Sequence, residues 1–366
     1  MDFRQLYAGG YLMRNDSTNL YDFENQKAVQ NGLISNSEGF IPYNHPPYEA
    51  LLFWLLSYLP YTAAYFCFAS LNLILLVICF LIGRPALSRQ GGIAQPKPGL
   101  QIFVFLPVVM AIVQGQDSII LLLGLCSVYR CLLSERRFAA GIVLGLLMFK
   151  LQVVLPLAVF LVAHFGFSLL AGFASGSLLV GAVSVAAVGW NTFLSFGRVL
   201  VLTGSVSFAK DAPYGILGVV PLAMPNLRGL LYGTAAGLFS RWTIFYVTFA
   251  ASVVLALWVM RLLKRRNLTK ELAFSLSTGG AVLLSYHLNV SDLTVMLLPL
   301  GILAGEDNVN LSRATWLFYC ASPLLFIVGV NTLFLLSLPL MMFLLGITQV
   351  ADREWRAATI AETSSA

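Results

Sequence analysis

Side chains suited to acid–base chemistry gather in the first sixty residues of this chain. Asp2 stands at the start, and Tyr43, Asn44 and His45 precede a Pro-Pro pair. A carboxylate partly shielded from water at the outer end of a membrane helix can accept a proton from a hydroxyl group. On position alone, Asp2 is better explained as a solvated residue near a chain end. The prolines hold the backbone extended, which suits His45 either for ligand contact or for an exposed position in a rigid joint.

Two further polar motifs interrupt the apolar part of the chain. Gln116 lies in the turn 114–117, where side-chain amides could bind hydroxyl groups, whereas Asp117 is as well explained by capping the helix that follows. Lys150 and Gln152 lie between two apolar runs. A lysine there is costly in lipid, so we expect it to face water or a partner such as phosphate, or to extend to the membrane surface.

A third motif contains His287 and Asp292 in a short turn between apolar segments. These residues could contact a polar ligand, or they could serve as ordinary helix-end residues. Metal binding would also use such side chains, but their spacing does not match a known metal motif, and we predict no metal and no cofactor.

The composition requires a membrane protein. The chain is 58% hydrophobic and 10% charged, with a mean hydropathy of +0.83, whereas about a quarter of a soluble domain is charged. The net charge of +6 comes from basic residues that are scattered or gathered at helix ends, which indicates membrane topology and no nucleic-acid partner. All five cysteines lie in apolar stretches and are predicted to be buried thiols.

Apolar runs predict an all-α polytopic fold of about eleven transmembrane or half-spanning helices. The runs are 62–83, 101–113, 117–133, 138–150, 152–164, 167–189, 242–263, 271–287, 292–305, 312–330 and 332–349. Several are shorter than the roughly 20 residues of a perpendicular span, so we expect half-helices that line a cavity.

The basic residues predict the orientation of these helices. Arginine and lysine concentrate in the loops near 84–97, 130–137 and 261–270 and after residue 350, which we therefore place in the cytoplasm. Residues 1–60 should then form an extracytoplasmic polar loop with an interfacial helix, residues 61–350 the transmembrane domain with an extracytoplasmic loop region at 190–241, and residues 351–366 a cytoplasmic tail. The polar motifs share the extracytoplasmic side. This count also predicts a further helix before Met1.

Taken in order, these motifs resemble glycosyltransferase family 87. The resemblance rests on Asp2-Phe3, Tyr7-Ala8-Gly9, Leu20-Tyr21-Asp22, Tyr43 with Pro46-Pro47, Gly115-Gln116, Lys150-Leu151-Gln152, Pro225-Asn226-Leu227-Arg228-Gly229 and His287 with Asp292-Leu293. It extends from Asp2 to about Pro299. The chain departs from the family pattern at Leu151, where a proline is common, and at Asn44-His45.

The resemblance implies a GT-C fold in the plasma (inner) membrane and the transfer of a hexose, typically mannose, from a polyprenyl-phosphate donor to a lipid or glycan acceptor. Asp2 would be the general base of an inverting reaction. Lys150, Arg198 and Arg228 would bind the donor phosphate. The residues expected at the substrate are Tyr43, Asn44, His45, Gln116, Gln152, His287 and Asp292. The alternative is a transporter or flippase, against which we find no internal repeat and no ionisable pair in mid-span.

Overall fold

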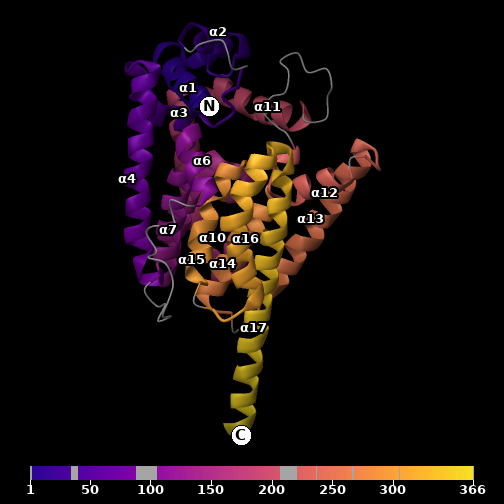
Figure 1. The fold of residues 1–366 in the computed structure, drawn as a ribbon. Helices are drawn as coiled ribbons and strands as arrows, with labels where there is room; N and C mark the ends of the chain where they lie inside the picture. The colour runs from indigo at the N-terminus through magenta and orange to yellow at the C-terminus, as the bar shows by residue number, and fades with distance from the viewer. Residues whose placement is uncertain are drawn as a thin grey trace.

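The fold was analysed in a computed structural model, which describes residues 2–33, 40–87, 105–206, 221–235, 237–265, 268–304 and 306–365. Within these ranges every regular element is a helix (Figure 1). Arg89, Lys97, Arg266 and the middle of the 190–241 region, which belong to the predicted loops, lie outside the described residues. The all-helical membrane fold predicted from composition is confirmed.

Six helical segments in the described part of the chain are long and apolar enough to cross a membrane. They are α4 (Tyr61–Leu87), η3 with α9 (Met148–Lys150 and Leu151–Phe165), α10 (Phe167–Val188), α13 (Arg241–Leu263), α16 (Val309–Val328) and η6 with α17 (Val330–Leu336 and Ser337–Ser365). These helices are apolar, and half or more of each span lies outside the protein interior, so each presents an apolar surface. Such surfaces are stable only against lipid.

Shorter helices complete the set of predicted runs. They are α6 (Leu106–Gln114), α7 (Ser118–Leu133), α8 (Arg137–Leu146), α14 (Lys270–Leu284) and the pair η5 (Val290–Met296) and α15 (Leu297–Ile302). Each predicted apolar run therefore contains a helix. Several of them are too short to span alone, as expected, because glycine, proline or polar turns end them.

The first sixty residues contain more helix than the predicted polar loop with a single interfacial helix. They contain α1 (Phe3–Asn15), α2 (Phe23–Leu33), α3 (Pro47–Trp54) and η2 (Leu56–Tyr58), which cap the upper end of the bundle in Figure 1. Most of α1 is buried, including Arg4 and Gln5. Phe3 anchors it by packing against several aromatic rings, including a stacked pair with Phe68 of α4 at 5.4 Å between ring centroids. This helix places Asp2 at a defined position.

Close packing between α8 and α10 fixes the helices behind this cap. A Cβ atom on Gly141 of α8 would collide with the backbone of Leu169, and one on Gly172 of α10 would collide with that of Phe138. Small residues let helix backbones approach closely in membranes. In α10, the Ser184 hydroxyl oxygen accepts a hydrogen bond from the backbone N–H of Tyr48 at 3.2 Å. This contact connects α3 to the α8–α10 pair.

The opposite end of the bundle carries its own charged contacts. Glu135 pairs with Arg137 and Lys270, Arg265 pairs with Asp352, and Arg353 pairs with Glu306. Basic loops therefore meet at one end, while the cap lies at the other (Figure 1). The predicted separation of the two kinds of loop is present in the fold. Residues after 350 continue α17 as far as Ser365.

The cysteines are less uniform than predicted. Cys79 and Cys126 are buried, Cys131 is partly buried, and Cys67 and Cys320 are exposed on their helices. The prediction of five buried thiols is wrong for the last two, because these positions face outward from α4 and α16. Their surroundings are the apolar surfaces of helices of membrane-spanning length.

Candidate active site

Asp2 meets the turn between α6 and α7. The side chain of Gln116 donates a hydrogen bond from Nε2 to Asp2 Oδ2. Gly115 makes this approach possible, because it adopts a left-handed conformation (φ +65°) and lies directly against the Phe3 side chain. Asp2 itself is only half-buried. One carboxylate oxygen is thus held by an amide while the group remains accessible to a ligand.

Lys150 lies at the centre of a buried group of polar residues behind Asp2. Its Nζ is 2.7 Å from Asp117 Oδ1 and 3.1 Å from Asp292 Oδ1. It also donates to Gln116 Oε1 at 3.4 Å. All four side chains are almost completely buried. The positive charge of Lys150 therefore joins the starts of α7, η5 and α9, and it orients the Gln116 amide so that Nε2 faces Asp2.

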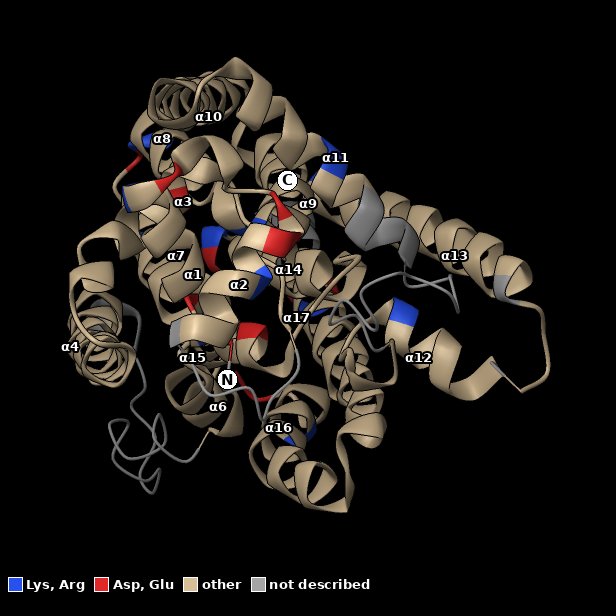
Figure 2. Cartoon of the chain, turned by 90° about the horizontal axis from the view of Figure 1, so that it is seen from above, with Lys and Arg blue, Asp and Glu red and all other residues tan. Residues whose placement is uncertain are grey.

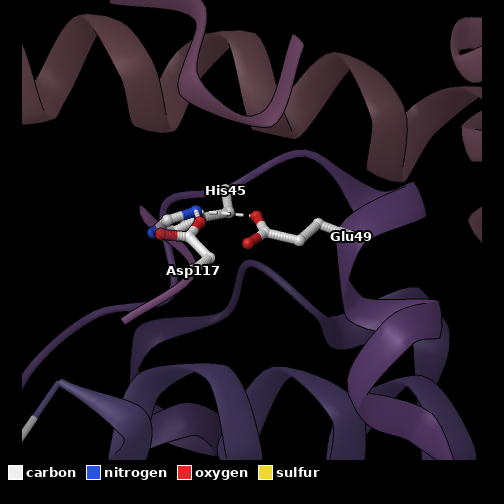
Figure 3. A group of neighbouring side chains, drawn as sticks. All are labelled: His45, Glu49 and Asp117. Atoms are coloured by element: carbon white, nitrogen blue, oxygen red, sulfur yellow. Dashed lines mark ion pairs between the residues drawn. The ribbon is translucent and has the colours of Figure 1, made fainter. Parts of the chain in front are cut away.

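His45, Glu49 and Asp117 form a second cluster beside Lys150 (Figure 3). His45 Nδ1 is 2.6 Å from Glu49 Oε2 and 3.6 Å from Asp117 Oδ2. His45 precedes α3 and Glu49 lies in its first turn, four residues later, so both face the same side. Viewed from the capped end, acidic and basic positions meet inside the ring of helices (Figure 2).

Burial controls the charges of this cluster. It lowers the pKa of His45 to about 4, although Asp117 opposes the shift. It raises the pKa of Glu49 well above its usual range, and nearby Asp117 adds to the increase. Burial also acts to raise the pKa of Asp117, but Lys150 and His45 outweigh it, so this pKa is lowered. Asp117 is consequently the ionised partner of Lys150.

Asp292 combines a structural contact with its ion pair. Its Oδ2 accepts the Asn289 backbone N–H at 3.0 Å in a capping box, while Oδ1 accepts the Ser118 hydroxyl at 2.8 Å. The capping explanation is therefore correct for Asp292. It is not correct for Asp117, whose side chain makes no capping hydrogen bond on α7.

A cavity of about 200 Å³ lies between α12 (Leu227–Ala235), α13 and the end of α14. Its lining is mainly apolar, with Arg228 and Tyr286 among the lining residues. The Arg228 guanidinium lies 4.0 Å from the centre of the Tyr286 ring and donates to the Tyr286 carbonyl at 3.2 Å. Asn226 holds the start of α12 here, since it donates to the Ser285 carbonyl at 2.6 Å and accepts from Gly229 N at 2.8 Å.

His287 follows Tyr286 of the cavity lining. Burial lowers its pKa to about 4, and the charges of Asp292, Lys150 and Arg228 all act on it. Its Nδ1 is enclosed by protein.

The structure brings together many of the residues singled out in the sequence, but not all of them. Gln116, Lys150, Asp292 and His45 join the buried group, and Asp2 lies at its edge. Tyr43 is fully buried behind His45, stacks on its ring and donates its hydroxyl to the Pro46 carbonyl at 3.0 Å, so it supports the loop. The remaining predicted residues are placed as follows: Asn44 and Gln152 are half-buried, and Arg198 is exposed on α11 (Trp190–Val206).

Glu49 and Asp117 belong to the buried polar cluster, but the sequence analysis did not identify either as a site residue. Glu49 was not singled out, and Asp117 was explained by capping. A signal was available for Glu49, because it is a lone carboxylate in the otherwise apolar segment 48–59 and follows His45 by four residues. The sequence also did not predict that Lys150 pairs with Asp117 and Asp292, which the structure brings together from separate helix ends.

Comparison with known proteins agrees with the resemblance seen in the motifs. The family model described as Glycosyltransferase family 87 matches residues 43–285, which is more than half of the 366-residue chain. No curated protein and no solved structure matches the chain significantly. The match includes His45, Glu49, Asp117, Lys150 and Arg228. The chain belongs to glycosyltransferase family 87 and is a membrane glycosyltransferase.

Proposed function

We propose that the protein transfers a hexose, with mannose as the first candidate, from a polyprenyl-phosphate donor to an acceptor hydroxyl on the extracytoplasmic side of the plasma membrane. Asp2 is the general base in this proposal. The observation that carries it is the contact of Asp2 with Gln116 at the edge of the Lys150 group, because a general base must be both held in place and accessible.

The proposed reaction inverts the anomeric carbon. Asp2 takes the proton of the acceptor hydroxyl as its oxygen forms a bond to that carbon. The bond from the carbon to the phosphate oxygen breaks, and its electron pair leaves with the polyprenyl phosphate. A nearby cation would stabilise the charge that develops on this leaving group.

Arg228 is the better candidate than Lys150 for that cation. Lys150 is 3% exposed and already pairs with two carboxylates, so the earlier assignment of Lys150 to the donor phosphate is replaced by a positioning role. Arg228 instead lines the apolar cavity. A guanidinium matches phosphate oxygens in geometry and charge.

The cavity also suits the lipid part of the donor. Its lining includes Phe245 and Phe249 of α13 and Leu284 of α14. Only 11% of the α13 span is buried, so this helix forms part of the lipid-facing surface. A polyprenyl chain could therefore lie in the cavity along α13, with its phosphate near Arg228. Arg198, exposed on α11, remains a predicted phosphate contact, and Asn44, Gln152 and His287 remain predicted substrate contacts.

Asp2→Asn tests the proposal because it keeps the shape of the side chain but removes the base. Membranes containing the variant would be incubated with radiolabelled polyprenyl-phosphate mannose, and labelled lipid or glycan product would be measured. We expect transfer to fall by a factor of about 10² or more. Asp22→Asn is the matched control, because Asp22 is exposed in the same capping region. Undiminished transfer by Asp2→Asn would exclude Asp2 as the base, and glucose or arabinose donors would test the sugar.

A further inference from the structure

His45, Glu49 and Asp117 present ligand atoms to one small volume inside the protein. One nitrogen or oxygen from each residue lies within 4.8 Å of the others. The three side chains are at most 9% exposed. Figure 3 shows the imidazole and the two carboxylates turned toward one another. An imidazole with two carboxylates is a common ligand set for first-row divalent metals.

The hydrogen bonding of this cluster is incomplete. Among the described residues, the side chains of His45, Glu49 and Asp117 have no hydrogen-bond partner apart from their contacts with one another and with Lys150. Asp117 is partly compensated by its ion pair with Lys150, but Glu49 faces only His45 and Asp117 at close range. Burying an ionised carboxylate with so few partners lowers the stability of the folded protein unless a bound cation or a proton neutralises its charge.

The separations within the cluster fit a bound metal ion. Bonds of 2.0–2.2 Å from nitrogen and oxygen place neighbouring ligands about 3 Å apart around one ion. The separations from His45 Nδ1, 2.6 Å to Glu49 and 3.6 Å to Asp117, bracket that value. Lys150 contacts the other oxygen of Asp117, Oδ1, so Oδ2 remains directed to His45.

The surrounding residues hold the ligands in these directions. Tyr43 stacks on the His45 ring with 5.6 Å between ring centroids. Tyr21 donates its hydroxyl to the His45 carbonyl at 2.6 Å. Pro46 and Pro47 fix the start of α3, which carries Glu49. Ordered surroundings of this kind orient ligands and support metal affinity.

We propose that His45, Glu49 and Asp117 form a binding site for a divalent first-row metal ion such as Mn²⁺ or Zn²⁺. The ion would link α3 of the cap to the start of α7, which is also the start of the Lys150 group. The site is separate from the assignment of Asp2 as the base, and it stands even if that assignment is wrong. Its role is to hold the cap on the bundle through ligands from both.

The test measures metal binding directly on the purified full-length protein. The protein is stripped with a chelator and dialysed, and Mn²⁺ is then titrated while free Mn²⁺ is followed by electron paramagnetic resonance. Zn²⁺ content after reloading is measured by mass spectrometry. We expect about one ion per chain and a rise in melting temperature on reloading.

Glu49→Gln is the principal variant because it keeps the side-chain size while removing the charge. We expect its Mn²⁺ affinity to fall at least tenfold and its thermal shift on reloading to disappear. Glu354→Gln, a partly buried carboxylate at the opposite end of the bundle, is the matched control and should bind as the wild type does. Affinity that is unchanged by Glu49→Gln would overturn the proposal.

A second measurement covers the case in which Glu49→Gln does not fold. Co²⁺ or Zn²⁺ bound to the wild-type protein would be examined by X-ray absorption. A first shell of nitrogen and oxygen with imidazole scattering supports the site. Failure of the wild-type protein to bind any of the three ions at millimolar concentration, with an infrared band of a protonated carboxyl group that disappears in Glu49→Gln, overturns it in favour of a buried proton.

Discussion

Lys150 Nζ lies 2.7 Å from Asp117 Oδ1, and this ion pair joins the start of α9 to the start of α7 inside the protein. Both side chains are at most 3% exposed. The same lysine also contacts Asp292 and Gln116. The charges of the candidate active site are thus interdependent, and removal of one of them should affect the others.

Lys150→Met should destabilise the protein strongly, because it keeps the length of the side chain but leaves Asp117 and Asp292 buried without their cation. Breaking a buried pair in this way costs about 3–5 kcal/mol. Thermal unfolding in detergent would measure it. Lys264→Met, at an exposed position in a loop of the opposite end, should change stability by less than about 0.5 kcal/mol. Equal melting temperatures for the two variants would contradict the central role of Lys150.

Gln116→Glu should change the pH dependence of sugar transfer. A second carboxylate beside Asp2 disfavours the ionised form of the base, so we expect the acidic limb of the kcat/KM profile to move to higher pH. Gln116→Leu removes the hydrogen bond to Asp2 without adding charge, so it should lower kcat and move the acidic limb in the same direction but by less than Gln116→Glu. Gln349→Glu, at the other end of the bundle where Gln349 binds Asn308 and Asn310, is the control. Identical pH profiles for all three variants would show that Gln116 does not influence the ionisation of Asp2.

Gly115→Ala should impair both folding and transfer. Alanine is disfavoured at φ +65°, and its Cβ would lie 2.6 Å from Phe3 Cβ, so α1 would have to move. We expect a loss of roughly 1–3 kcal/mol in unfolding free energy and a reduced kcat, measured by thermal unfolding and product formation. Gly32→Ala on α2 provides the comparison, because nothing lies within 4 Å of a Cβ at this helical position. It should be neutral or slightly stabilising.

His287 should make the protein less stable in mild acid. Its pKa is lowered from 6.5 to about 4 by burial, so the unfolded chain binds a proton between these pH values while the folded protein does not. Stability is therefore full above pH 6.5 and falls as the pH is lowered toward 4. At pH 5 the loss from this residue is on the order of 2 kcal/mol.

Melting temperatures of wild type and His287→Gln between pH 7.5 and pH 5 would measure this effect. The variant should lose less stability than the wild type over that range, since glutamine does not titrate. A steeper loss in His287→Gln than in the wild type would show that His287 gains its proton readily in the folded protein. Other buried groups contribute equally to both proteins and cancel in the comparison.

The apolar helices and the division of the loops between two ends could be predicted from the sequence. Both depend on local composition, because a run of apolar residues must be helical in lipid and basic residues gather in particular loops. The importance of Lys150 was predictable for the same reason, since an isolated lysine among apolar residues needs a partner. The motifs around Gln116, Arg228 and His287 were also visible, and together they indicated the family.

The partners of these residues were decided only by the tertiary structure. Glu49, Asp117, Lys150 and Asp292 are far apart in the chain, and no local pattern states which helix ends meet. Capping was a sufficient explanation of Asp117 until the fold placed Lys150 beside it. Likewise, the polar composition of residues 1–60 predicted a loop with a single interfacial helix, whereas packing of Phe3 against aromatic neighbours stabilises a further, buried helix that positions Asp2. Long-range packing and charge compensation within the protein interior, which local composition does not encode, account for both differences.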